Sequence, residues 1–236
     1  MIVSDKQFVD FNFDPCYNNI MKPQVYIESC IDTLKRDIEY NYVLCSPPDF
    51  DELGEEKDLN YSNFVDTWAP LLNPTGNFVT ICISDRKHNG EILSKHSQVI
   101  DSFKKIDYKL HTHKIWVKSL GHGLYRMSYQ HLMTFSRNGQ KRKLEKELIP
   151  DCHYVEEKKN IADFRDSNNK KYIWGMPTII VEKLIRTYTD EGDTVYDPFI
   201  GSGTTAEASL NTNRKWIGSE INPEFADICL KRTALL

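Results

Sequence analysis

The 236-residue sequence has no apolar run near the roughly 18 residues that a membrane-spanning helix needs. Its first residues, Met1 to Lys6, also lack the basic segment followed by a long apolar one that marks a secretory signal. We therefore expect a cytoplasmic, intracellular protein with no membrane partner. With 40% hydrophobic and 27% charged residues the composition is that of a globular protein, and the length favours one domain over residues 1–236.

The six cysteines are scattered and include no Cys-x-x-Cys pair or paired histidine spacing, which argues against disulfides and against a metal site. Cys45 and Cys82 lie inside apolar runs, where a thiol acts as a small hydrophobic group. Six of the seven histidines fall between His88 and His131, but none has a nearby nucleophile or metal spacing. We expect these histidines on the surface or at phosphates, and no bound metal.

The chain as a whole has a net charge of −4 and therefore no excess of positive charge, but its middle segment is basic. From Arg86 to Lys146 there are fourteen Lys or Arg residues against four Asp or Glu. This distribution favours contacts with nucleic-acid phosphates, with a solvated surface as the alternative. Residues 137–171 are polar and lack periodicity, which predicts an inserted basic loop or lobe that recognises the target. The candidate nucleic-acid contacts are Lys118, Arg137, Lys141, Arg142 and Lys143.

A glycine turn near residue 200 follows an apolar run and precedes a predicted helix. Gly201 and Gly203 permit positive φ and close backbone approach, as at a ligand-binding turn. The turn lacks the Lys-Ser/Thr of a phosphate-binding loop and the third glycine of a dinucleotide site, so a diphosphate cofactor is disfavoured. Glu220 follows a second predicted strand, where a carboxylate can accept ribose hydroxyls. A nucleoside without phosphates remains, although a lone Gly-x-Gly also occurs in turns that bind nothing.

A second turn, Ser46-Pro47-Pro48-Asp49-Phe50, ends another predicted strand. Two prolines fix φ and remove two donors, which leaves rigid carbonyls that only accept hydrogen bonds. An amino group is their natural partner, Ser46 adds an acceptor, and the aromatic ring of Phe50 can stack on a planar base. The turn therefore suits an extruded base with an exocyclic amine, with a plain proline turn as the alternative.

Hydrophobic periodicity predicts alternating strands and helices, with a strand or arm within residues 1–22. The predicted strands are 25–27, 40–44, 77–83, 110–118, 129–136, 194–196 and 215–218. The predicted helices are 29–38, 61–71, 90–103, one opening at Pro177, one opening near Thr204, and 223–230.

The order of these motifs, Ser-Pro-Pro first, a basic insert next and Asp-Pro-Phe-Ile-Gly-Ser-Gly-Thr-Thr last, resembles the beta group of amino-methylating DNA methyltransferases over residues 25–232. The resemblance implies an α/β Rossmann-like fold with a mostly parallel sheet, helices on both faces and a permuted motif order. It implies S-adenosylmethionine as cofactor, DNA (double-stranded rather than single-stranded) as partner, and direct methyl transfer to a flipped base; a homodimer is compatible with it. Catalysis is implied at Ser46, Pro47, Pro48, Asp49 and Phe50, and cofactor binding at Asp197, Phe199, Gly201, Ser202, Gly203, Thr204, Thr205 and Glu220.

Two departures from that family pattern leave alternatives open. The family usually has an aromatic directly after the second proline, whereas this chain has Asp49, so Phe50 takes the stacking role, Asp49 bonds an unusual base, or activity is lost. The aspartate often found before the first helix is replaced near Ser29. Serine before the prolines leans towards cytosine-N4 over adenine-N6. The alternatives are an inactive nucleic-acid-binding subunit, an RNA amino-methyltransferase and, more weakly, methylation of a protein amide.

Overall fold

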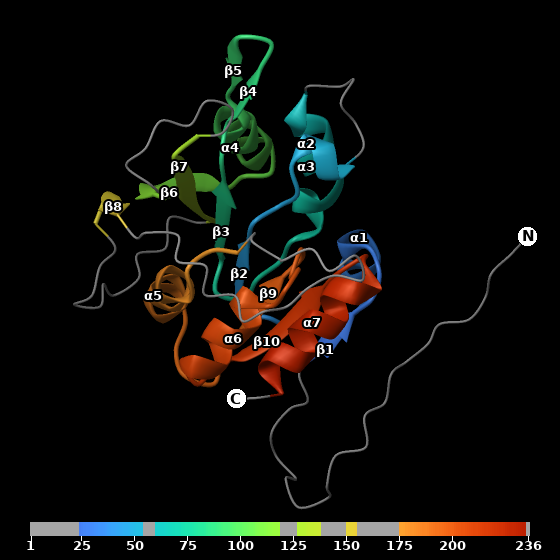
Figure 1. Cartoon of the computed structure of the whole chain (residues 1–236). Helices are drawn as coiled ribbons and strands as arrows, with labels where there is room; N and C mark the ends of the chain where they lie inside the picture. Colours follow the sequence, from blue (N-terminus) through green and yellow to red (C-terminus); the bar gives the residue numbers. More distant parts are fainter. Residues whose placement is uncertain (1–23, 54–59, 119–126, 138–149, 155–174, 235–236) are drawn as a thin grey trace, which may run out of the picture.

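The computed structural model describes residues 24–53, 60–118, 127–137, 150–154 and 175–234 (Figure 1). The helices are α1 (Cys30–Leu34), α2 (Phe50–Leu53), α3 (Tyr61–Trp68), the 3-10 turn η1 (Ala69–Leu71), α4 (Lys95–Lys105), α5 (Thr178–Tyr188), α6 (Thr204–Asn211) and α7 (Pro223–Thr233). The strands are β1 (Gln24–Tyr26), β2 (Tyr42–Cys45), β3 (Phe78–Ile83), β4 (Arg86–His88), β5 (Glu91–Leu93), β6 (Lys109–Val117), β7 (Tyr129–Ser136), β8 (Cys152–Tyr154), β9 (Thr194–Asp197) and β10 (Lys215–Ser219). No helix among the described residues combines the length and apolar character needed to cross a membrane.

Eight strands form one sheet in the order β1-β10-β9-β2-β3-β7-β6-β8. The five strands from β1 to β3 in that order run parallel, β7 is antiparallel to β3 and to β6, and β8 is parallel to β6. The expectation of a mostly parallel α/β sheet is therefore confirmed. The parallel strands β1, β10, β9, β2 and β3 all end at one carboxyl edge, where ligands of open α/β sheets bind.

Buried side chains alternate along the central strands, so each face of the sheet supports its own layer of helices. Val43 and Cys45 face a core shared with α1, α3 and α4, whereas Tyr42 and Leu44 face a core shared with α5. A smaller cluster packs α6 and α7 against β10 (Figure 1). Burial on both faces explains why β2 and β3 read as continuous apolar runs in the sequence.

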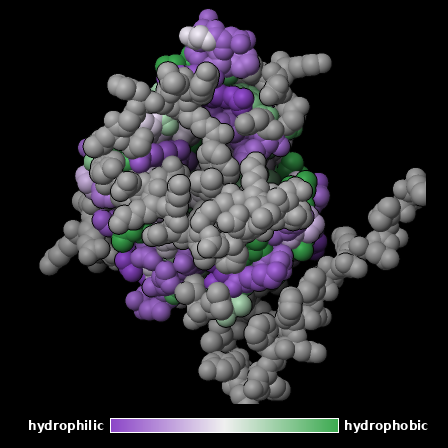
Figure 2. All heavy atoms as spheres, viewed as in Figure 1, coloured by the Kyte–Doolittle hydropathy of each residue, from purple (hydrophilic) through white to green (hydrophobic). Residues whose placement is uncertain are grey.

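The predicted helix over residues 90–103 is wrong in its first third, because residues 86–93 form a hairpin of β4 and β5. Asn89 and Gly90 lie between the two strands with φ of 49° and 84°, the double positive φ of a two-residue hairpin turn. The helix itself begins at Lys95. The hairpin projects from the body of the protein and is largely hydrophilic at its tip (Figures 1 and 2).

The predicted insert at 137–171 falls mostly outside the described residues, as do the strand or arm within residues 1–22 and the three basic residues Lys141, Arg142 and Lys143. Where the insert is described, Cys152–Tyr154 is not a loop but a strand that pairs with Ile115, Trp116 and Val117 of β6. This part of the insert therefore extends the sheet at its β6 side.

Candidate active site

The turn after β9 folds around the carboxylate of Asp197. Its Oδ1 accepts a hydrogen bond from the Phe199 N–H at 2.9 Å, and its Oδ2 accepts one from the Thr205 hydroxyl at 2.6 Å. Asp197 is only 4% exposed, and burial raises its pKa to about 7 despite these two bonds. Asp197 and Thr205, both expected at the cofactor, thus hold each other inside the turn.

Glu220 joins the end of β10 to this turn. Its Oε2 accepts a hydrogen bond from the Gly201 N–H at 3.0 Å, and its Oε1 accepts one from the Asn222 N–H at 2.9 Å. Burial raises the pKa of the Glu220 carboxyl, while these backbone donors oppose the rise. Of the eight residues expected at the cofactor, Phe199, Gly201 and Glu220 are half-buried and the other five are buried. The half-buried three define the accessible side of the turn.

Gly203 fits a close contact with α7. Its φ is 86°, and a Cβ placed there would lie 2.7 Å from the Cys229 sulfur and 3.0 Å from the Cys229 Cα. Arg232, also on α7, donates to the Thr204 hydroxyl at 3.1 Å and to the Ser202 carbonyl at 3.3 Å. The structure therefore turns Ser202 and Thr204 towards α7. No pattern in the sequence indicated these contacts, because Arg232 is nearly thirty residues away from the turn.

The Ser-Pro-Pro loop leaves the adjacent strand, β2, at the same edge of the sheet. Tyr42 and Val43 of β2 pair with Val195 and Tyr196 of β9, so the loops that follow the two strands are neighbours. Ser46 is exposed, Pro47 is buried, and the Ser46 hydroxyl oxygen accepts a hydrogen bond from Gln130 Nε2 at 3.4 Å. Gln130, on β7, is a positioning contact that the sequence did not reveal.

Helix α3 joins the two loops. The Tyr61 hydroxyl donates to the Pro48 carbonyl at 2.7 Å, and the rings of Phe64 and Trp68 lie 5.8 and 5.1 Å from the ring of Phe199. Helix α3 therefore contacts the Ser-Pro-Pro turn through its first residue and the glycine turn through Phe64 and Trp68. The structure brings together the two motifs that the sequence separates by 150 residues.

Asp49 is held by a buried lysine. Its Oδ1 lies 2.8 Å from Lys95 Nζ and 3.7 Å from the Arg86 guanidinium. Burial would raise the pKa of Asp49, but Lys95, the Phe50 N–H and Arg86 hold it below its ordinary value. The Asp49 N–H donates to Glu52 Oε2 at 2.7 Å, so the residue also caps α2.

Phe50 does not present its ring to a base in this structure. It is 3% exposed and packs edge-on against Tyr61, with ring centroids 5.3 Å apart. The short helix α2 turns the ring into the core shared with α3, so the expected stacking of Phe50 on a base requires the ring to leave this core.

The two described basic candidates lie at opposite edges of the sheet. Lys118 follows β6, and its N–H donates to the Ser128 carbonyl at 2.7 Å, near the edge that carries Ser46. Arg137 instead follows β7 beside Asn77, at the start of β3, and its guanidinium lies 4.4 Å from the centroid of the Tyr108 ring. Arg137 is thus not brought to the edge that carries Ser46.

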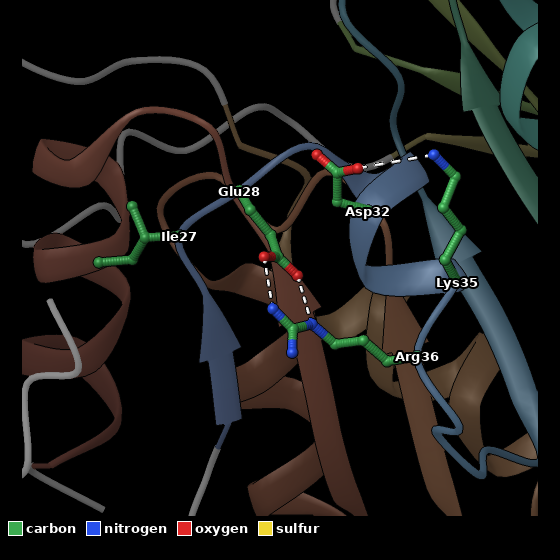
Figure 3. Close-up of a pocket in the computed structure, with 5 residues that line it drawn as sticks. All are labelled: Ile27, Glu28, Asp32, Lys35 and Arg36. Atoms are coloured by element: carbon green, nitrogen blue, oxygen red, sulfur yellow. Dashed lines mark hydrogen bonds and ion pairs between the residues drawn. The ribbon is translucent and has the colours of Figure 1, made fainter. Parts of the chain in front are cut away.

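A hollow lies beyond the end of β1 (Figure 3). It is next to Ser29, near which the aspartate that the family often has before its first helix is replaced. Glu28 accepts two hydrogen bonds from Arg36, at 2.7 and 2.8 Å, and Asp32 pairs with Lys35 at 3.7 Å. Ser29 caps α1 by accepting a hydrogen bond from the Ile31 N–H at 3.3 Å. The charges that line the hollow are thus paired with one another.

The surface role expected for the histidines is wrong for His131, which is 5% exposed. His131 lies beside His96 and His113, with ring centroids 4.1 and 5.0 Å away, and next to the buried Asp85. These residues come from separate elements, so no short sequence spacing could have indicated the cluster.

The pH dependence of stability tests the state of Asp197. The native carboxyl keeps its proton up to about pH 7, whereas an unfolded aspartate releases it near pH 4, so wild-type stability from this group falls as pH rises between those values. Asn cannot ionise, so Asp197→Asn lacks this pH-dependent loss of stability. As pH rises, we expect the unfolding free energy of the variant to increase relative to that of wild type by up to about 1.4 kcal/mol per pH unit. Urea unfolding at pH 5, 6 and 7 measures the difference, and parallel pH profiles would contradict the assignment.

A double-mutant cycle tests the pair of Asp49 and Lys95. Asp49→Asn leaves a lysine that is 2% exposed without its nearest carboxylate, so we expect a loss of about 1 to 3 kcal/mol. Adding Lys95→Met is expected to restore stability, because methionine fills the space beside Phe50 and Tyr61 without a charge. Urea unfolding measures all four chains. Additive losses would show that the pair does not hold the loop.

A Rossmann-like sheet with the glycine turn and the Ser-Pro-Pro turn at one edge, where ligands of open α/β sheets bind, fits the methyltransferase class of protein. The family model described as DNA methylase, N6_N4_Mtase, matches residues 13–231. The chain therefore belongs to the N6 and N4 DNA methylase family, S-adenosylmethionine-dependent enzymes that methylate amino groups in DNA, as the sequence motifs predicted.

Individual relatives agree with the family assignment. The orphan methyltransferase M.BamHII of Bacillus amyloliquefaciens is 28% identical over 240 residues, which cover 83% of this chain and 89% of that protein. The PvuII DNA methyltransferase, described as cytosine-N4-specific, superposes with a TM-score of 0.71 at 18% identity over 88% of this chain and 85% of that one. TTHA0409 of Thermus thermophilus, solved with S-adenosyl-L-methionine, superposes with a TM-score of 0.66 at 20% identity, over 90% of this chain and 95% of that one. At these identities the solved structures support the fold.

Proposed function

We propose that the chain transfers the methyl group of S-adenosylmethionine to the N4 amine of a cytosine flipped out of double-stranded DNA. The observation that carries the proposal is the pairing of β2 with β9, which sets the loop of Ser46 beside the turn of Gly201. The name of the PvuII enzyme as cytosine-N4-specific, together with serine before the two prolines, supports cytosine over adenine.

In the proposed reaction the cofactor's nucleoside lies against the half-buried side of the glycine turn, beside Phe199, Gly201 and Glu220. Glu220 already accepts two backbone hydrogen bonds, and its remaining lone pairs accept the ribose hydroxyls. Asp197, Ser202, Gly203, Thr204 and Thr205 shape the turn from within. When bound, the cofactor would supply an electrophilic methyl group on its sulfonium sulfur.

The base enters on the side of Ser46 and Pro47. Its amine donates hydrogen bonds to the exposed Ser46 hydroxyl oxygen and to the Pro47 carbonyl, which raises electron density on nitrogen. The nitrogen attacks the methyl carbon as the carbon–sulfur bond breaks and its electron pair stays on sulfur. The methylated nitrogen then loses a proton to water. The Pro48 carbonyl accepts a hydrogen bond from the Tyr61 hydroxyl, and this bond stiffens the loop.

The family aromatic is replaced by Asp49, and Phe50 is buried, so neither residue stacks on the base in this arrangement. We propose instead that Asp49 acts through Lys95, as the ionic anchor of the loop. Lys118, at the same edge, and the basic residues Lys141, Arg142 and Lys143 are proposed to contact DNA phosphates.

Nucleoside mass spectrometry tests the proposal. The chain is incubated with S-adenosylmethionine carrying a deuterated methyl group and with unmethylated double-stranded DNA, single-stranded DNA or RNA. We expect labelled N4-methylcytosine in double-stranded DNA. Labelled N6-methyladenine would overturn the choice of base, and label in RNA alone would overturn the choice of nucleic acid. No labelled base in any DNA, from a chain that binds the cofactor by calorimetry, would overturn the activity.

A further inference from the structure

Three metal-ligating side chains from separate elements converge behind the catalytic loop. Asp85 follows β3, His96 lies in the first turn of α4, and His131 lies on β7. His96 Nδ1 is 2.8 and 2.9 Å from the two carboxylate oxygens of Asp85, and His131 Nε2 is 3.4 Å from one of them. The side chains of Asp85 and His131 are 3% and 7% exposed and that of His96 is 25% exposed, so the cluster opens to solvent beside His96.

A fourth residue, His113, fixes the orientation of His131. The Nδ1 atom of His131 lies 2.8 Å from Nε2 of His113, so a proton on His131 Nδ1 makes a hydrogen bond to that nitrogen. The His131 Nε2 atom is buried, and among the described residues it has no partner with hydrogen-bond geometry, although Asp85 Oδ2 lies 3.4 Å away. In that tautomer its lone pair faces the carboxylate of Asp85, and a positive ion between them satisfies both. Histidines that bind metals commonly donate their other ring N–H to such a neighbour.

The spacing of the donor atoms suits one ion. The three donors lie within 4.8 Å of one another, whereas ligands about 2.1 Å from a tetrahedral ion lie about 3.4 Å apart. The His96 and His131 rings are stacked at 19°, with centroids 4.1 Å apart, and both rings bring a nitrogen close to the carboxylate of Asp85. Binding requires one ring to tilt, and the partly exposed His96 has room to do so. Two imidazoles with one carboxylate favour zinc or a related transition metal over magnesium or calcium.

We propose that Asp85, His96 and His131 bind one divalent transition-metal ion such as Zn²⁺, with a fourth position open to water. The ion positions the catalytic loop without touching the reacting atoms. Lys95, directly before His96, pairs with Asp49, and Gln130, directly before His131, donates to Ser46. The site therefore fixes the two elements from which the loop is held.

Metal binding can be measured without any methylation assay. A Cys152→Ser chain serves as background, since Cys152 is an exposed thiol that could bind zinc on its own. After treatment with a chelator, this chain is titrated with Zn²⁺ by calorimetry and with Co²⁺ by visible absorption. We expect one equivalent of metal, and a Tm about 5 to 10 °C higher at a Zn²⁺ concentration of 100 Kd.

Variants identify the ligands. His96→Gln and His131→Gln are each expected to weaken Zn²⁺ binding by about 100-fold, and His113→Gln by about 10-fold. His88→Gln, on the projecting hairpin, is the control and should bind as the background chain does. If the buried His131 variant fails to fold, His96→Gln and the Co²⁺ spectrum still decide. No binding at millimolar Zn²⁺, or unchanged binding by His96→Gln, would overturn the proposal.

Discussion

Replacing Ser46 with alanine is expected to lower kcat for methyl transfer by about 100- to 1000-fold while leaving the affinity for S-adenosylmethionine unchanged. The hydroxyl is exposed at the end of β2 and is proposed to accept a hydrogen bond from the amine as charge develops on nitrogen. The glycine turn, which we propose holds the cofactor, is fixed by a different set of contacts, from Asp197, Glu220 and α7. Single-turnover transfer to DNA measures the rate, and calorimetry measures cofactor affinity.

Ser84→Ala is the matched control for this prediction. Ser84 directly follows the neighbouring strand β3, and its hydroxyl donates to the Tyr129 carbonyl at 3.1 Å. Ser84→Ala thus removes a serine hydroxyl from an adjacent loop and leaves Ser46, the proposed acceptor of the amine, in place. We expect its rate to stay within a few-fold of wild type. A Ser46→Ala rate equal to that of the control would contradict the catalytic role, and a parallel loss of cofactor binding would assign Ser46 to structure.

Periodicity placed the parallel strands because burial on both faces of β2, β3 and β9 makes them continuous apolar runs. It failed where local turn chemistry decides the structure. Asn89-Gly90 is a strong hairpin signal, but the hairpin strands are only three residues long, too short to show alternation before α4 begins. Cys152–Tyr154 is similarly short and becomes a strand only because β6 offers an edge.

The two candidate turns could be located in the sequence because glycine and proline act through the local backbone. The contacts that support those turns could not, because they depend on the packing of distant elements. Arg232 reaches the glycine turn from α7, and Gln130 reaches Ser46 from β7. Asp49 did carry a local signal: with Glu52 three residues later it forms a capping pair, which starts α2 and turns Phe50 inwards.

Replacing Gly203 with alanine is expected to cost about 3 kcal/mol or more of unfolding free energy and to abolish cofactor binding. Two penalties combine here. Positive φ costs a residue with a Cβ about 1 to 2 kcal/mol, and overlap with the core costs about 1 to 3 kcal/mol more. The overlap is severe because the added atom meets the backbone of Cys229 at 3.0 Å, which can yield only if α7 moves. Such a movement separates Arg232 from Ser202 and Thr204 and opens the turn.

Gly192→Ala separates the two penalties. Gly192 has the same φ of 86°, but a Cβ there meets nothing within 4 Å. We expect this variant to lose only the cost of the backbone conformation, about 1 to 2 kcal/mol, and to bind S-adenosylmethionine as wild type does. Urea unfolding measures both variants, and calorimetry measures the cofactor. Equal losses of stability in the two variants would show that α7 moves away from the added Cβ with no measurable cost in unfolding free energy. Cofactor binding retained by Gly203→Ala would mean that the contact between the turn and α7 does not shape the cofactor site.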